Sequence, residues 1–187
     1  MARKIYRVIS WSLLILTLVS ILLALRKPSV VPVEVSPQAA KSFDDKLAQL
    51  EQAHQQGAPQ EIRITEAELN SKLQQGMQEA SVATGGAAAL KGATIHLESD
   101  KLVGTFTVSV SGKDVYVTLG GNLAAQNGAL QFTPTEMKMG SLPVPISAVE
   151  STLREKLNSP EMRDRMKLPD SIRDIRIENG ELVLQSK

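Results

Sequence analysis

The chain has 187 residues, 42% of them hydrophobic and 22% charged, which suits one folded domain plus a membrane anchor but not two full domains. It contains no cysteine, which excludes disulfides, thiol catalysis and cysteine-ligated metals. The net charge of +1 hides an asymmetry: the first 27 residues carry five basic residues and no acid, whereas the rest carries 16 basic and 20 acidic residues. Because binding to phosphates needs concentrated cations, this acidic part excludes nucleic acid as a partner.

An uncharged segment runs from Val8 to Leu25. As a helix of 18 residues it would be roughly 27 Å long, close to the thickness of the hydrocarbon core of a bilayer. A cleaved signal peptide is the alternative, but its apolar core is usually shorter and ends in small residues at alternating positions. The segment therefore predicts an uncleaved transmembrane helix that acts as a signal anchor.

Basic residues flank this segment, with Arg3, Lys4 and Arg7 before it and Arg26 and Lys27 after it. The small excess before it favours an N-terminus inside the cell. We therefore expect a single-pass protein of the cell membrane, with its C-terminal domain outside the cytoplasm. The expected segments are a short cytoplasmic tail (1–7), the anchor (8–25), a linker that contains prolines (26–36) and an extracytoplasmic α+β domain (37–187).

Two helices and a short strand are predicted after the linker. Ser36 and Pro37 are typical of an N-cap and a first helical position, and an apolar stripe continues from Ala40 to His54. The segment 61–64 is a strand candidate. Thr65 and Glu68 form a capping box, which starts a helix that carries Leu69, Leu73 and Met77 on one face.

From Ala93 to Met139 apolar and polar residues alternate, which predicts an antiparallel meander with one apolar face. Asn127 and Gly128 are a strong hairpin signal, and Pro134 implies a bulge or an edge. Such a sheet must cover its apolar face. The prediction is an α+β fold, an antiparallel meander sheet with helices on one face.

The last third of the chain starts with a stiff crossover at 140–145, where each proline favours an extended predecessor. Ser147 and Glu150 then predict a second capping box and a helix with an apolar stripe. Ser159 and Pro160 predict a further short helix, and the turn at 179–180 predicts a terminal hairpin.

This order of elements resembles the LmeA-like phospholipid-binding family and the related YpmS-like membrane-anchored proteins of bacterial envelopes. Four features carry the resemblance over roughly residues 61–187: the segment Thr65-Glu66-Ala67-Glu68-Leu69-Asn70, the meander, the two-proline crossover at 140–145, and the hairpin around Glu178-Asn179-Gly180. The resemblance implies a curved sheet wrapped over helices, similar to the tubular lipid-binding fold. It also implies an apolar cavity for lipid tails, and it supplies no catalytic residues.

The leading functional hypothesis is therefore a non-catalytic protein that binds phospholipid or another apolar ligand, without a cofactor or metal, between sheet and helices. Flexible aliphatic and methionine side chains suit acyl chains, although the same pattern also describes an ordinary filled core. The candidate cavity residues, which are those expected to face inward, are Leu69, Leu73, Phe106, Val108, Val117, Leu119, Phe132, Met139, Val149, Leu153 and Leu157.

Two other functional classes are compatible with a small folded domain to different degrees. A protein-interaction or scaffold module of an envelope complex is the alternative, because the stripe of the helix at 37–56 could pair with a partner helix. An enzyme is disfavoured, because Glu66 and Glu68 have roles at a helix start. His54 and His96 also lack the spacing of metal ligands.

Overall fold

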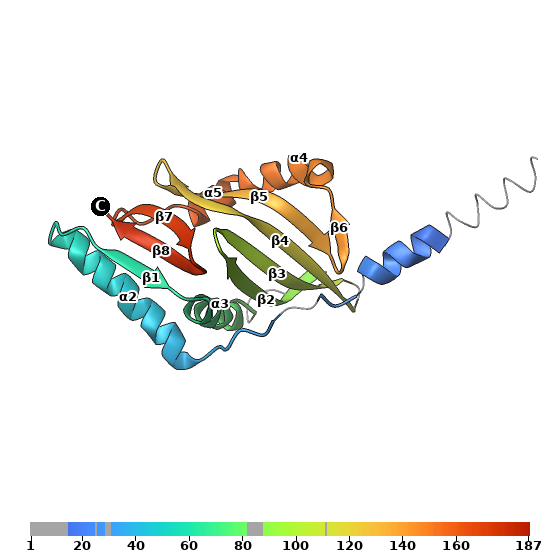
Figure 1. Cartoon of the computed structure of the whole chain (residues 1–187), viewed down its shortest axis with the longest axis horizontal. Coiled ribbons are helices and arrows are strands. Elements are labelled where there is room, and N and C mark those ends of the chain that lie inside the picture. Colours follow the sequence, from blue (N-terminus) through green and yellow to red (C-terminus); the bar gives the residue numbers. More distant parts are fainter. Residues whose placement is uncertain (1–14, 25, 29–30, 82–87, 111) are drawn as a thin grey trace, which may run out of the picture.

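The computed structural model describes residues 15–24, 26–28, 31–81, 88–110 and 112–187, and all structural statements below refer to these residues. It confirms an α+β fold with antiparallel sheets and helices (Figure 1). Two separate sheets are present, one of five strands and one of three, where the sequence predicted one meander and a terminal hairpin.

The five-stranded sheet is the predicted meander, and its strands follow one another in chain order. They are β2 (Ala88–Glu98), β3 (Lys101–Val110), β4 (Lys113–Gln126), β5 (Ala129–Met139) and the short β6 (Leu142–Val144). Asn127 and Gly128 take φ values of 53° and 74° in the β4–β5 turn, which is why this dipeptide is favoured there. The pairing shifts register opposite Pro134, so the predicted bulge is confirmed.

The three-stranded sheet has the order β1-β8-β7, from β1 (Glu61–Ile64), β8 (Glu181–Ser186) and β7 (Ile172–Glu178). The predicted terminal hairpin forms β7 and β8, and the predicted short strand is β1. The pairing of β1 with β8 was not predicted. It joins residues about 120 positions apart, such as Ile64 and Leu182, and no local pattern signals so distant a partner.

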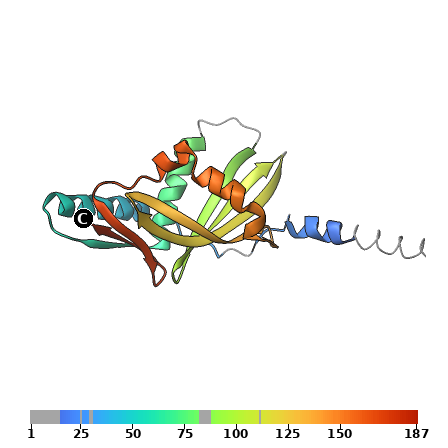
Figure 2. The same cartoon turned by 90° about the horizontal axis from the view of Figure 1, so that it is seen from above.

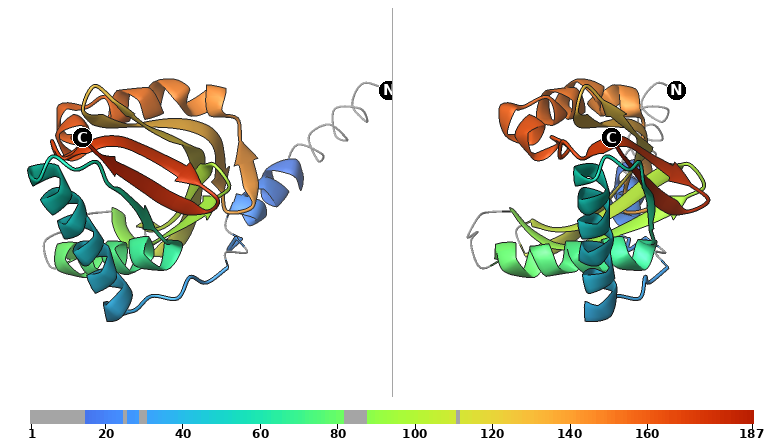
Figure 3. Two further views of the ribbon diagram at one scale, coloured as in Figure 1. Left: turned by 60° about the vertical axis from the view of Figure 1, so that its left-hand side comes forward. Right: turned by 90° about the vertical axis from the view of Figure 1, so that its left-hand side faces the viewer.

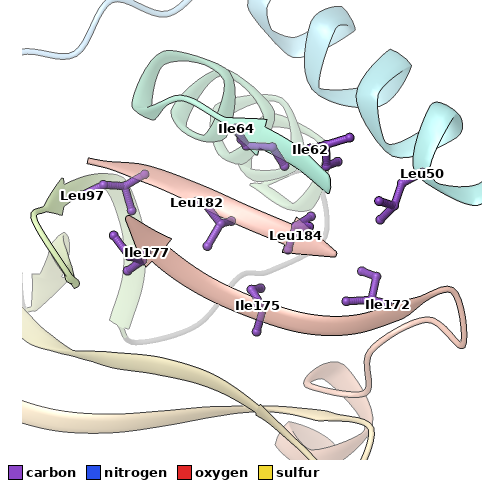
Figure 4. Close-up of a cluster of buried hydrophobic side chains, with 9 residues drawn as sticks. All are labelled: Leu50, Ile62, Ile64, Leu97, Ile172, Ile175, Ile177, Leu182 and Leu184. Atoms are coloured by element: carbon purple, nitrogen blue, oxygen red, sulfur yellow. The ribbon is translucent and has the colours of Figure 1, made fainter. Parts of the chain in front are cut away.

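The buried core belongs mainly to this small sheet. Ile64 is fully buried and Leu50, from α2 (Pro37–Gln55), is 1% exposed. Figure 4 shows these side chains gathered between α2, the small sheet and the end of β2. The cluster consists of Leu50, Ile62, Ile64, Leu97, Ile172, Ile175, Ile177, Leu182 and Leu184. Leu97 is its member from the large sheet, so the core lies at one end of the molecule.

The other face of the small sheet is closed by ion pairs. Val183 is fully buried, and its neighbours in the two flanking strands are Arg63 and Arg176. The guanidinium of Arg176 lies 2.7 Å from Glu61 and 2.6 Å from Glu178. The stems of the arginines cover an apolar residue while their charged ends remain partly in solvent.

The helix α2 begins as predicted, with the Ser36 hydroxyl accepting from the amide of Ala39 at 3.1 Å. Its apolar stripe packs within the domain, where Leu50 and Ala53 are buried and Phe43 and Leu47 contact the core. The stripe on which the scaffold alternative depended is therefore covered in large part by the domain itself.

The helix α3 (Glu66–Ser81) opens with the predicted capping box. The Glu68 amide donates to the Thr65 hydroxyl at 3.3 Å, and the Glu68 carboxylate accepts from the Thr65 amide at 2.9 Å. The same carboxylate accepts from Ser42, and the ammonium of Lys46 lies 2.8 Å away, so Glu68 also binds α2. Burial alone would raise the pKa of Glu68, but these hydrogen bonds lower it to about 2.

The opposite side of α3 holds the free edge of β2. The Asn70 amide nitrogen donates to the Ile95 carbonyl at 2.6 Å, and its oxygen accepts from the Ile95 amide at 2.7 Å. Four residues earlier, Glu66 accepts from the Leu97 amide. An exposed strand edge would otherwise present unpaired backbone groups, so these side chains replace a neighbouring strand.

Two helices follow the large sheet, α4 (Ile146–Leu157) and α5 (Pro160–Arg165). The prediction for α5 is confirmed, since the Ser159 hydroxyl accepts from the Met162 amide at 3.3 Å. The predicted capping box of α4 is wrong. Because the helix starts at Ile146, directly after Pro145, Ser147 lies inside its first turn, and Glu150 pairs with Arg154 at 2.6 Å.

The N-terminal helix is described over residues 15–24 and projects from the end of the large sheet (Figures 1 and 2). No helix of the described part is long and apolar enough to span a membrane. Residues 8–14 and 25 of the predicted anchor lie outside the described residues. The predicted cytoplasmic tail at 1–7 lies outside them as well.

The Glu68 contacts predict an acid-dependent loss of stability. Since the folded pKa is lowered from an ordinary 4.5 to about 2, the carboxylate stabilises the fold above pH 4.5 and this contribution disappears toward pH 2. Replacing Glu68 by Gln should lower the free energy of unfolding at pH 7 by about 2–3 kcal/mol and flatten its decrease below pH 5. Urea unfolding of the full chain in non-ionic detergent measures both. Glu51→Gln, at an exposed position of α2, is the control and should behave as the unmodified chain.

The double hydrogen bond of Asn70 predicts a second effect on stability. Asn70→Ala leaves both backbone groups of Ile95 without their partner and should destabilise the fold by about 2 kcal/mol. Hydrogen exchange of the Ile95 amide should accelerate with it. Asn122→Ala, an exposed asparagine of β4, should leave this exchange unaltered. An unchanged Ile95 exchange rate in Asn70→Ala would disprove the role of Asn70 at the edge.

Candidate functional site

Strand pairing places the predicted inward residues of the large sheet on one face. Phe106 lies opposite Val117, Val117 lies opposite Met139, and Leu123 lies opposite Phe132. Because alternate residues of a strand share a face, these positions also define where Val108 and Leu119 lie. We call the six residues Phe106, Val108, Val117, Leu119, Phe132 and Met139 the apolar sheet face. On the opposite face the hydroxyls of Thr105 and Thr118 lie 3.1 Å apart.

Glycines make room for the two aromatic rings of the apolar sheet face. A Cβ added at Gly104 would lie 3.0 Å from the ring of Phe106, and one added at Gly121 would lie 2.7 Å from the ring of Phe132. Each ring therefore lies over a neighbouring glycine on the sheet surface. The rings are thereby kept close to the sheet and do not fill the space above it.

The helices lie at the edges of the large sheet and do not seal this face. Figure 3 shows the curved sheet with α3 at one edge and α4 at the other. None of the six residues of the apolar sheet face is buried, and Met139 is 36% exposed. The helix α4 has no buried residue, so its apolar stripe is not embedded in a core.

A groove of about 920 Å³ separates the β4–β5 hairpin from α4 and α5. Phe132, Leu153 and Leu157, three of the predicted cavity residues, line it together. Leu130, Ile146 and Met166 complete its apolar lining. Its size lies within the range of small-molecule pockets, about 300–1,000 Å³.

One end of this groove is formed by the chain after α5. The Leu130 amide donates to the Met166 carbonyl at 2.7 Å, and the Leu168 amide donates to the Gly128 carbonyl at 2.9 Å. This short pairing brings Met166 against the start of β5. This pairing was not predicted, because the segment is too short to show an alternating pattern.

Basic side chains border the groove. Arg154 pairs with Glu150 at 2.6 Å, and Lys167 pairs with Asp164 at 2.7 Å. Arg163 also lines the groove, and it has no ion pair with any described residue. The hydrogen bond and charge of Lys167 lower the pKa of Asp164, so this pair stays ionised. An apolar floor beside cations suits an amphiphile with an anionic head.

The remaining predicted cavity residues lie elsewhere. Leu69 packs against the core of the small sheet, so it has a structural role there. Leu73 of α3 and Val149 of α4 are partly buried. Phe106, Val108, Val117, Leu119 and Met139 belong to the apolar sheet face and do not line the groove itself. The structure thus brings three of the predicted residues into one groove.

No arrangement for metal binding occurs among the described residues. The Nδ1 atom of His96 lies 3.4 Å from the Glu66 carboxylate, whose other oxygen accepts from the β2 backbone. This contact belongs to the joint between α3 and β2.

No protein-family model, no curated protein and no solved structure matches the chain. The apolar sheet face and the groove are therefore the features from which a function can be inferred.

Proposed function

We propose that the protein is a membrane-anchored, non-catalytic protein of the cell envelope that binds phospholipid or another apolar ligand between its large sheet and its helices. The groove of about 920 Å³ is the observation that carries this proposal. Its lining includes Leu130, Phe132, Leu153 and Leu157, and α4 forms one of its walls without closing it. The resemblance to phospholipid-binding envelope proteins implies the same ligand class.

The partial exposure of the apolar sheet face supports a ligand over a filled core. Exposed apolar surface costs about 25 cal/mol per Å² relative to burial, so a sheet with no ligand would be expected to hide this face. In this chain the sealed core lies around the small sheet, where Ile64 and Val183 have no exposed surface. A contiguous apolar surface that stays open indicates a binding site.

The N-terminal helix supports the membrane anchor. Most of its described aliphatic side chains are exposed, with Leu16 and Leu22 both at 62%. A helix whose aliphatic side chains find no cover from protein is suited to lipid. The basic residues around the segment from Val8 to Leu25 favour the orientation with the domain outside the cytoplasm.

Photolabelling tests the proposed ligand. The full chain is placed in vesicles that contain a phospholipid with a diazirine near the end of one acyl chain, and labelled peptides are mapped by mass spectrometry. We expect labels on α4 and β5 in addition to the N-terminal helix. Replacing Leu153 and Leu157 by Glu should reduce labelling of the domain at least about tenfold, a loss of about 1.4 kcal/mol in binding. Both residues are only partly buried, so the variant should fold.

The matched control places two glutamates at Ser151 and Thr152, which are exposed on the same helix. It adds the same charge outside the groove, and labelling of the domain should stay within about twofold of the unmodified chain. Labels confined to the N-terminal helix in the unmodified chain would disprove the lipid proposal and favour a scaffold role.

A further inference from the structure

The end of the N-terminal helix is attached to the turn between β5 and β6. The Ser141 amide donates to the Leu23 carbonyl at 2.9 Å, and the same carbonyl accepts from the backbone amide of Arg26 at 3.3 Å. The last carbonyls of a helix have no hydrogen-bond donor within the helix. The turn supplies a donor to one of these carbonyls. On its other side the turn is held by the large sheet, where the Gly140 amide donates to the Tyr116 carbonyl at 2.7 Å.

Only glycine fits at the centre of this contact. Gly140 has a φ of +58°, and a Cβ there would collide with the carbonyl of Ala24 and lie 2.5 Å from that of Leu23. These atoms belong to the backbone and cannot turn aside. The helix and the large sheet are thus joined by close backbone packing, which restricts how the domain can tilt relative to the helix.

The same end of the large sheet carries exposed apolar side chains. Among the described residues of the domain, the exposed large hydrophobic residues are Leu90 at 50%, Val110 at 46% and Met139 at 36%. Leu90 pairs with Val108, two residues before Val110, and Met139 directly precedes Gly140. We call Leu90, Val110 and Met139 the apolar rim. It extends across strands β2 to β5, roughly 15 Å at about 4.8 Å per strand. Met139 is level with Phe106, so it is offset from Val110 by four residues along the strands.

We infer that the apolar rim lies in the interfacial layer of the bilayer that holds the N-terminal helix. The partner is a lipid surface, because the rim adjoins the turn that contacts an apolar helix whose side chains are themselves exposed. Lysines stand beside the rim. Lys113 pairs in register with Val110, and Lys91 follows Leu90 in the chain. Such side chains can place the ammonium at the level of lipid headgroups while the stem remains in apolar surroundings.

This inference depends on the proposed membrane anchor and extends the proposed function. Phe106 and Val117 of the apolar sheet face pair with each other, and each is four residues from the hairpin end at Val110 and Lys113. Val117 also pairs with Met139 of the rim. With the rim in the interface, the apolar sheet face would begin at the membrane surface. An acyl chain could then pass from the bilayer to the sheet without crossing water.

Because the chain has no cysteine, single cysteines can report on the rim without background. Leu90→Cys, Val110→Cys and Met139→Cys are labelled with nitrobenzoxadiazole in the full chain, in vesicles of phosphatidylcholine and phosphatidylglycerol. Asp100→Cys, at the β2–β3 turn of the opposite end, is the reference. The rim labels should shift to the blue and be quenched by lipids with a nitroxide near the headgroup, and the Asp100 label should not. A blue shift without quenching by these lipids would overturn the inference and indicate a second protein chain on the rim.

Gly140→Ala tests the attachment. It should reduce lipid quenching of the Val110 label by at least about half, because the side chain separates the turn from the helix. Gly57→Ala is the matched control, since Gly57 has a φ of +67° and nothing within 4 Å of an added Cβ. Both variants carry a similar backbone strain of about 1 kcal/mol, so a difference between them reports the contact. Equal quenching in both would overturn the proposed attachment.

Flotation and photolabelling separate the two proposals. Vesicle-bound chain with a photolabelled groove and an unquenched rim would overturn this inference alone. Chain that does not float with the vesicles would overturn the membrane anchor and the rim together.

Discussion

The first two turns of α3 are the joint on which the arrangement of the two sheets depends. Glu68 binds α2 through Ser42 and Lys46, and Glu66 and Asn70 bind the edge of β2. Leu69, between them, packs against the core of the small sheet. One helical segment thus connects the small sheet, α2 and the large sheet. Polar side chains hold α3 at the edge of β2. The helix therefore lies beside the apolar sheet face and does not cover it.

The residues that stabilise the fold and the residues of the open apolar surface belong mainly to different sheets. The small sheet supplies the sealed core. Its inner face is buried, and ion pairs cover Val183 on its other face. The large sheet is held by its own ladder hydrogen bonds, by α3 at one edge and by β6 and the crossover at the other. Its apolar face therefore contributes less to stability than its composition suggests. Substitutions in the groove can alter binding with a modest effect on folding, since the groove residues Leu153 and Leu157 are only partly buried.

Local signals in the sequence predicted most of the elements. Ser36, Thr65 and Ser159 cap helices as expected, and the glycine turns at 127–128 and 179–180 lie where the hairpins turn. These features depend on a few neighbouring residues, so a single sequence contains them. The capping box at Ser147 and Glu150 failed because Pro145 sets the helix start one residue after itself. Alternation also missed the start of β2, where Ala88 and Ala89 carry no contrast between faces.

The candidate site was harder to predict, because it depends on distances between elements. Alternation predicted which residues share the apolar face of the sheet, and the strand registers place Phe106, Val117 and Phe132 on one face. It could not show that Leu69 would join a second sheet, since that sheet depends on the pairing of β1 with β8. Nor could it show how far α4 stands from β5, which the pairing of Met166 with Leu130 helps to determine. A periodic pattern states which side chains point inward, and only the packing of whole elements decides whether they meet.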